Sequence, residues 1–222
     1  MPTVHGCAVD AKPRVDQAFA MTQRLPNAAI LILAAGHSRR MHGVDKLLEP
    51  VAGQPLIRRQ AQVALATRLP VWIALPPDRP LRNAALQGLA VGIVEVANAS
   101  LGMSYSLIAG NAAVPAGMAL ILWLADLPDI TTDDLRTLAS AAQRSPNALI
   151  RATTAAGKLG HPVVFPPDFR AELNDLTGDN GARDILKRHA TNTVFVPLPG
   201  TRALTDLDTP EDWATWRAGS PL

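Results

Sequence analysis

A short stretch near residue 40 combines small residues, a hydroxyl group and three cations in a pattern that suits phosphate binding. It follows a continuous apolar run, residues 30–35, and contains Gly36, Ser38, Arg39, Arg40 and Lys46. Small residues let backbone N–H groups approach a polyanion closely, and arginine and lysine neutralise phosphate charge. The spacing is neither that of a Walker A loop nor that of a dinucleotide-binding turn. These residues therefore favour a nucleoside triphosphate, and a basic, solvated connection between strand and helix is the alternative.

A second position with chemical potential is Asp126, which directly follows the most apolar run of the chain, residues 118–125. A carboxylate at the end of a buried strand is poorly solvated and needs a cation or a helix N-terminus as its partner. A threonine can cap the helix that follows, so Asp126 is free to bind a metal ion. Asp206 and Asp208 are two apart on an extended segment and point the same way, although one of them need only be structural.

Three further segments could contact a bound anion. Gly102 and Ser104 open a helix whose N-terminus favours anions, and an ordinary helix start explains them equally well. His161 lies beside a strand, where a lone histidine is usually a hydrogen-bonded structural residue. A glycine-rich turn leads into a helix over residues 182–189, whose amides and Arg183 suit a phosphate group. An N-capped surface helix is the alternative for that last segment.

These residues lie at the ends of short apolar runs that alternate with helical patterns. We expect strands near residues 30–35, 70–75, 91–96, 118–125, 148–153, 157–165 and 194–196. We expect helices over residues 55–66, 82–89 and 182–189, and others that begin near residues 101, 132 and 210. Such alternation is typical of an α/β fold with a mainly parallel sheet. In open α/β sheets ligands bind beyond the carboxyl ends of the strands, where Gly36 and Asp126 are expected.

The stretch from Leu33 to Met41, followed by Lys46, resembles the signature loop of nucleotidyltransferases that attach a nucleotide to a phosphorylated acceptor. Within that group it is most similar to the molybdenum-cofactor branch, which builds molybdopterin dinucleotides. Further segments resemble motifs of that branch in the expected order, namely residues 102–106, 126–128, 160–163, 178–183 and 206–212. The resemblance covers about residues 29–217, and one departure is His42, which stands where the branch usually has glycine.

The resemblance implies a three-layer, Rossmann-like nucleotidyltransferase fold and a reaction that requires Mg²⁺. By that match Asp126 and Asp208 would hold the ion, and Arg40, Lys46 and Asp126 would be the catalytic residues. The nucleotide would contact Leu33, Ala34, Ala35, Gly36, Ser38, Arg40, Lys46, Gly102 and Ser104. The phosphorylated acceptor would contact His161, Asp179 and Arg183.

The resemblance also narrows the substrates to CTP first and GTP second, with a molybdopterin-type acceptor. Branch members with Leu-Ala-Ala-Gly tend to use CTP and those with Leu-Ala-Gly-Gly tend to use GTP, and Ala35 stands at that position. A sugar phosphate or methylerythritol phosphate is an alternative acceptor for the same fold. A non-catalytic nucleotide-binding partner of a molybdoenzyme is a further alternative, against which intact Asp126, Asp208 and Lys46 speak. A molybdoenzyme apoprotein is a candidate partner in either case.

The composition argues against several other classes of protein. The chain has 222 residues, a net charge of +2 and only 4% aromatic residues, which disfavours a nucleic-acid-binding module. Cys7 is the sole cysteine, so an internal disulfide and a Cys-based zinc site are excluded. No apolar stretch reaches the roughly 18–20 residues that span a membrane, and we expect a cytoplasmic protein. Residues 1–28 are expected to be a poorly ordered extension, followed by a single nucleotidyltransferase domain over residues 29–222.

Overall fold

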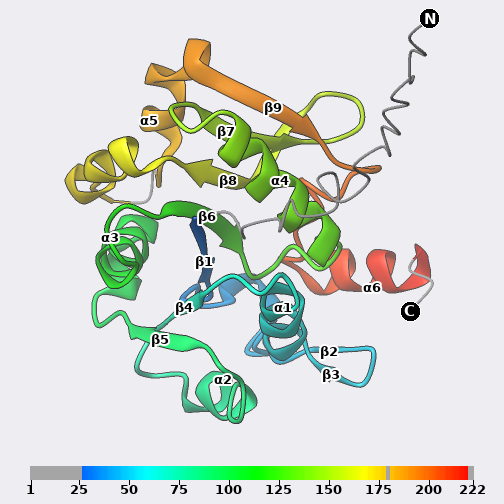
Figure 1. The fold of residues 1–222 in the computed structure, drawn as a ribbon. Coiled ribbons are helices and arrows are strands. Elements are labelled where there is room, and N and C mark those ends of the chain that lie inside the picture. The colour runs from blue at the N-terminus through cyan, green and yellow to red at the C-terminus, as the bar shows by residue number, and fades with distance from the viewer. Residues whose placement is uncertain (1–26, 179–180, 220–222) are drawn as a thin grey trace, which may run out of the picture.

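A seven-stranded sheet runs through the computed structural model, which describes residues 27–178 and 181–219 (Figure 1). Its strand order is β5-β4-β1-β6-β8-β7-β9. The strands are β1 (Ala28–Leu33), β4 (Val71–Leu75), β5 (Gly92–Glu95), β6 (Ala119–Leu124), β7 (Leu149–Thr153), β8 (Leu159–Phe165) and β9 (Thr193–Pro197). All neighbouring pairs are parallel except β6 with β8 and β7 with β8, because β8 runs in the opposite direction. The expected α/β fold with a mainly parallel sheet is confirmed.

Residues 1–26 of the expected N-terminal extension lie outside the described residues. Ala28, which the prediction assigned to the extension, is the first residue of β1. The predicted acceptor-binding residue Asp179 also lies outside the described part of the chain.

Helices cover both faces of the sheet, which explains why the central strands are apolar on both sides. Alternate residues of β1 point to opposite faces, so that Ile30 and Ile32 belong to one core cluster and Leu31 and Leu33 to the other. The first cluster includes residues of α1 (Leu56–Leu65), α4 (Thr132–Arg144) and α6 (Pro210–Gly219). The second includes residues of α3 (Met103–Ala113) and α5 (Arg183–Arg188). The result is a three-layer arrangement (Figure 1).

Local hydrogen bonds fix the starts of the two helices that follow the carboxylate-bearing segments. At the start of α4, Thr131 and Asp134 form a reciprocal capping box. This agrees with the predicted helix start near residue 132. At the start of α6, the Thr209 hydroxyl accepts from the Asp212 amide, and the Asp212 carboxylate accepts from the Thr209 amide. The Asp212 carboxylate also accepts from the amide of Asp208, so this cap holds the backbone of a predicted metal ligand.

Several elements differ from the expected pattern. Helix α2 spans Pro80–Ala85 rather than residues 82–89, because a proline is suited to the first turn of a helix and Gly88, at a φ of +79°, lies beyond its end. A two-stranded hairpin of β2 (Pro50–Val51) and β3 (Gln54–Pro55) was not expected. Neither were the 3₁₀ helices η2 (Arg39–Met41), η3 (Ala99–Leu101), η4 (Pro167–Asp175) and η5 (Ala190–Asn192). Among the described residues, no helix is long and apolar enough to cross a membrane.

Candidate active site

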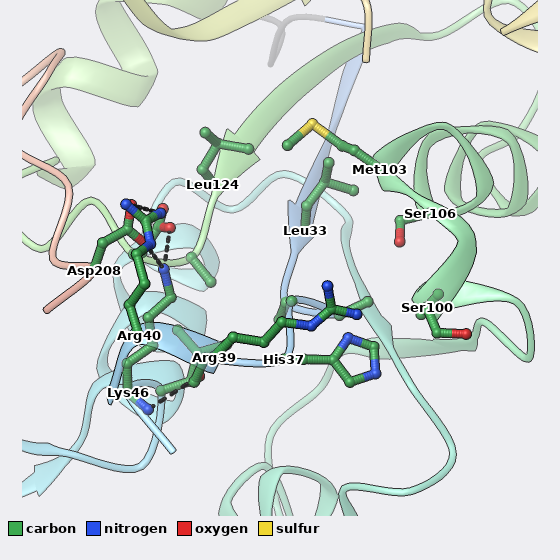
Figure 2. Close-up of a pocket in the computed structure, with 18 of the residues that line it drawn as sticks. Leu33, His37, Arg39, Arg40, Lys46, Ser100, Met103, Ser106, Leu124 and Asp208 are labelled. Atoms are coloured by element: carbon green, nitrogen blue, oxygen red, sulfur yellow. Dashed lines mark hydrogen bonds and ion pairs between the residues drawn. The ribbon is translucent and has the colours of Figure 1, made fainter. Parts of the chain in front are cut away.

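A cavity of about 370 Å³ opens at the carboxyl ends of β1 and β6, between the loop after β1 and the start of α3 (Figure 2). Most of the predicted nucleotide and metal residues line it: Leu33, Ala34, Ala35, Gly36, Ser38, Arg40, Lys46, Gly102, Asp126 and Asp208. Figure 2 shows Arg40, Lys46 and Asp208 grouped on one side of the cavity, and Ser100 and Ser106 on the other. The cavity therefore has one strongly charged wall and one wall with neutral hydroxyl groups.

The loop after β1 takes a tightly turned path. Ser38 and His42 flank η2, and both have left-handed backbone conformations, with φ values of 53° and 48°. Position 42 is therefore one that favours glycine, which agrees with the glycine that the resembled branch usually has there. A Cβ atom at Gly36 would meet nothing within 4 Å, so the space beside this backbone is open to the cavity.

Arg82, which the sequence pattern did not single out, ties this loop to α2. Its side chain is fully buried and forms a two-bond ion pair with Asp45, at Nε–Oδ2 and Nη2–Oδ1 distances of 2.7 and 2.8 Å. Its Nη1 donates to the carbonyl of Ala34 at 2.5 Å, and its Nη2 lies 3.4 Å from the hydroxyl of Ser38. One guanidinium thus contacts the beginning, the middle and the end of the loop. The 37 residues between Asp45 and Arg82 hide this pairing from any local sequence pattern.

Lys46 lies between the two predicted metal ligands. Its Nζ donates to Asp126 Oδ2 and to Asp208 Oδ1, both at 2.6 Å, and Arg40 pairs with the other oxygen of Asp208 at 2.5 Å. Burial tends to lower the pKa of Lys46, but the two carboxylates outweigh it and hold the pKa above its usual value. Burial likewise tends to raise the pKa of Asp208, but Lys46 and Arg40 bring it below the usual value. The lysine is therefore charged and the Asp208 carboxylate ionised at neutral pH.

The two carboxylates have the chemistry of a divalent metal site. Asp126 Oδ1 is buried without a hydrogen-bond partner among the described residues, and Asp126 Oδ2 and Asp208 Oδ1 both accept from Lys46 Nζ, so the two carboxylates face each other across the lysine. Within residues 27–178 and 181–219, no group of three or more His, Cys, Asp or Glu side chains is arranged to hold a metal. Two carboxylates completed by water and phosphate oxygens form the donor set that Mg²⁺ prefers, so the residues present fit this ion.

The start of α3 differs in detail from the expectation. Gly102 lines the cavity, whereas Ser104 is only 1% exposed and is absent from the lining residues. The Ser104 amide donates to the carbonyl of Gly178, which joins α3 to the turn before α5. Ser100 and Ser106 line the cavity instead, and sequence analysis did not assign them. The positions of these serines depend on where the turn after η3 ends, which a helical pattern does not specify.

Two of the predicted acceptor residues, His161 and Arg183, are not among the residues that line this cavity. His161 is half-buried on β8, and its Nδ1 is buried without a partner among the described residues. Burial, followed by the charge of Arg151, lowers the pKa of His161 to about 4, against the opposing effect of Asp126. Arg183 is exposed at the first position of α5. The structure thus brings most of the predicted nucleotide and metal residues together, with Ser104 as the exception, and all of these roles remain predictions.

Comparison with known proteins identifies the family. A family model described as a MobA-like NTP transferase domain matches residues 30–193. A probable molybdenum cofactor guanylyltransferase from Synechococcus elongatus is 52% identical over 54 residues, which is 24% of this chain and 27% of that protein. The chain therefore matches only about a quarter of the length of that curated relative.

Solved structures share the fold over nearly the whole chain. The crystal structure of Rv0371c from Mycobacterium tuberculosis H37Rv is 25% identical, with a TM-score of 0.73, and covers 87% of this chain and 99% of its own. Another structure of that protein, 24% identical with a TM-score of 0.71 and the same coverage, is a complex with manganese. Molybdopterin-guanine dinucleotide biosynthesis protein A from Archaeoglobus fulgidus, 14% identical with a TM-score of 0.63, covers 84% of this chain and 95% of its own. The chain belongs to the family of MobA-like NTP transferase domains.

Proposed function

We propose that this enzyme transfers a nucleoside monophosphate, CMP in the first instance, from the triphosphate to a phosphorylated acceptor of the molybdopterin type. The observation that carries this proposal is the convergence of Lys46 and Arg40 with Asp126 and Asp208 on one wall of the cavity. Two cations and two carboxylates that can hold a divalent ion form an arrangement for neutralising a triphosphate. The names of the partial relative and of the Archaeoglobus structure support the choice of a molybdopterin acceptor.

The proposed reaction forms a bond between an acceptor phosphate oxygen and the α-phosphorus, and it breaks the bond to the pyrophosphate leaving group. A phosphate monoester has its second pKa near 6, so it is already largely dianionic at pH 7 and needs no strong general base. Lys46 and Arg40 would bind the β- and γ-phosphates and balance the charge that develops on the pyrophosphate. Mg²⁺ held by Asp126 and Asp208 would supply further charge neutralisation and alignment.

The choice of CTP rests on Ala35. This residue is buried, with 4% of its surface exposed, and lines the cavity next to Gly36. By the resemblance, alanine at this position goes with CTP and glycine with GTP. GTP is the second candidate, because the curated relative is named a guanylyltransferase.

Pyrophosphate release, measured with Mg²⁺ and molybdopterin for CTP, GTP, ATP and UTP in turn, tests this proposal. Release with CTP alone would support both the acceptor and the role of Ala35. Release with GTP alone would retain the acceptor and overturn the base assignment. No release with any of the four would reject molybdopterin as the acceptor, and a sugar phosphate or methylerythritol phosphate would then be tested in its place. No release with any acceptor would favour the non-catalytic, nucleotide-binding alternative.

A further inference from the structure

The face of the sheet that bears two cavity-lining residues continues across β8 and β7 to the β9 edge. The strand register pairs Leu33 with Leu124, and both of these residues line the cavity. On the next strands it pairs Val163 with Arg151, and Arg151 with Phe195. Paired residues share a face of the sheet, and so do residues two apart on one strand. Because Leu122 pairs with Val163, the face that bears Leu124 also bears Arg151.

Arg151 is an unusual residue for this place. It lies between Ile150 and Ala152, both fully buried, in the middle of a strand, and it is itself half-buried. Burial alone lowers its pKa, with no carboxylate acting against that effect. Its Nε donates to the carbonyl of Gly160 at 3.2 Å, and the described residues offer its two terminal nitrogen atoms neither a hydrogen bond nor an ion pair. A half-buried guanidinium without a counter-charge is available to an anion, and burial strengthens its attraction to one.

His161 lies next to the backbone that this arginine contacts. The Nε of Arg151 donates to the carbonyl of Gly160, the residue directly before His161. The buried Nδ1 of His161 has no partner among the described residues. β8 runs antiparallel to β6 and pairs Val163 with Leu122, so His161 lies toward the end of β6 at which Leu124 and Asp126 line the cavity. The charges of Arg151 and Asp126 both act on the pKa of His161. An anion on Arg151 would therefore lie near the charged wall of the cavity.

We infer that Arg151 binds the phosphate group of the acceptor and holds it on the β8–β7 side of the nucleotide cavity. The inference rests on the proposed function, because it assigns the second substrate to a specific cation. The two terminal nitrogens of the guanidinium can donate to two phosphate oxygens. The hydrogen bond from Nε to the Gly160 carbonyl orients the Arg151 side chain. His161 is neutral at pH 7 and adds a neutral hydrogen-bonding group next to the phosphate. Arg183, by contrast, is exposed on α5.

Two measurements test this inference on the full chain. In the first, inorganic phosphate is titrated into protein with Mg²⁺ and α,β-methylene-CTP present in excess to fill the nucleotide cavity, and the histidine ring signals are followed by NMR. The His161 signal is assigned by its loss in His161→Asn. In the second, the acceptor KM, the kcat and the CTP Kd are measured with molybdopterin. The variants are Arg151→Met and Arg151→Lys, and Arg144→Met is the matched control because Arg144 is exposed at the end of α4.

The expected result is that phosphate shifts the His161 signal in the wild type and in Arg144→Met. In Arg151→Met the phosphate affinity and the acceptor KM should worsen by roughly tenfold to a hundredfold, while the CTP Kd is unchanged. Arg151→Lys should recover part of the loss, because it restores the charge without the planar fork. Equal phosphate affinity in the wild type and Arg151→Met, or no phosphate effect on His161 in the wild type, would overturn the inference. If the wild type transfers no nucleotide, the proposed function fails, and the phosphate titration still decides whether Arg151 is an anion site.

Discussion

Replacing Arg82 with methionine tests whether this buried arginine fixes the conformation of the loop after β1. Methionine keeps the apolar length of the side chain but removes the guanidinium that contacts Asp45, Ala34 and Ser38. The Asp45 side chain is only 11% exposed, so the change leaves a nearly buried carboxylate without its cation. Removing one partner of a buried ion pair costs about 3–5 kcal/mol of unfolding free energy. In a chain of this length that corresponds to a fall in melting temperature of roughly 6–20 °C.

A double-mutant cycle separates the ion pair from the loss of packing. Arg82→Met, Asp45→Leu and the double variant are compared by urea denaturation and by nucleotide binding. The double variant should be more stable than Arg82→Met alone, because it no longer buries an unpaired charge. Nucleotide affinity should fall in all three variants, because the loop backbone loses its anchor. Arg136→Met is the control: its pair with Asp133 is exposed on both sides, and its loss should cost about 1 kcal/mol or less.

The reasoning would be refuted by Arg82→Met behaving like Arg136→Met in stability, or by strictly additive effects of the two single changes. Unchanged nucleotide affinity in a destabilised Arg82→Met would show that the pair stabilises the fold without shaping the loop.

Three further predictions follow from the same structure. Asp126→Ala should abolish turnover while circular dichroism remains that of the folded protein, and substantial residual Mg²⁺-dependent activity would remove Asp126 from the metal site. Gly160→Ala should destabilise the protein by about 1–3 kcal/mol or more in urea denaturation, because the added Cβ would meet the backbone carbonyl of Ala203; wild-type stability would show that this contact relaxes freely. His161 has a folded-state pKa of about 4 against an ordinary value of 6.5, so below pH 6.5 the unfolded chain binds a proton that the folded chain does not. Unfolding free energy should therefore decrease by up to about 1.4 kcal/mol per pH unit between pH 6.5 and 4, and an equally steep decrease in His161→Asn would contradict this origin.

The strands of the central sheet could be predicted from the sequence because a strand that is buried on both faces consists almost entirely of apolar residues. β1 and β6 are almost entirely apolar, and the residues that follow them lie at the cavity, as the position of Gly36 and Asp126 indicated. Helix starts were predictable where a threonine and an acidic residue form a local cap, as at Thr131 and Asp134. These features depend on contacts within a few residues of one another.

The residues that sequence analysis missed depend on distant partners. Arg82 belongs to a short helix whose pattern is typical of a solvated surface, and only the folded chain brings it to Asp45. The predicted Ser104 is buried, and Ser106, two positions later in α3, lines the cavity in its place, because the turn before the helix determines which helix face is turned to the cavity. Arg151 did leave a trace, since a charged residue between buried neighbours in a strand requires an explanation. Without the sheet order, however, its position beside His161 and on the side of the nucleotide cavity could not be inferred.

The loop after β1 is anchored at both of its ends by charges, and this explains how it can present open backbone to a ligand. Arg82 binds the Ala34 carbonyl at the start of the loop and the Asp45 carboxylate near its end, and both residues are nearly buried. Directly after Asp45, Lys46 holds the two carboxylates of the cavity wall together, where they would otherwise repel each other. Between these anchors the hydroxyl of Ser38 accepts from the Lys46 amide, while the backbone beside Gly36 stays open to the cavity and can approach a phosphate group. Because the anchors are made within the protein, the phosphate-binding backbone is organised before the nucleotide binds, and binding energy is not used to order it.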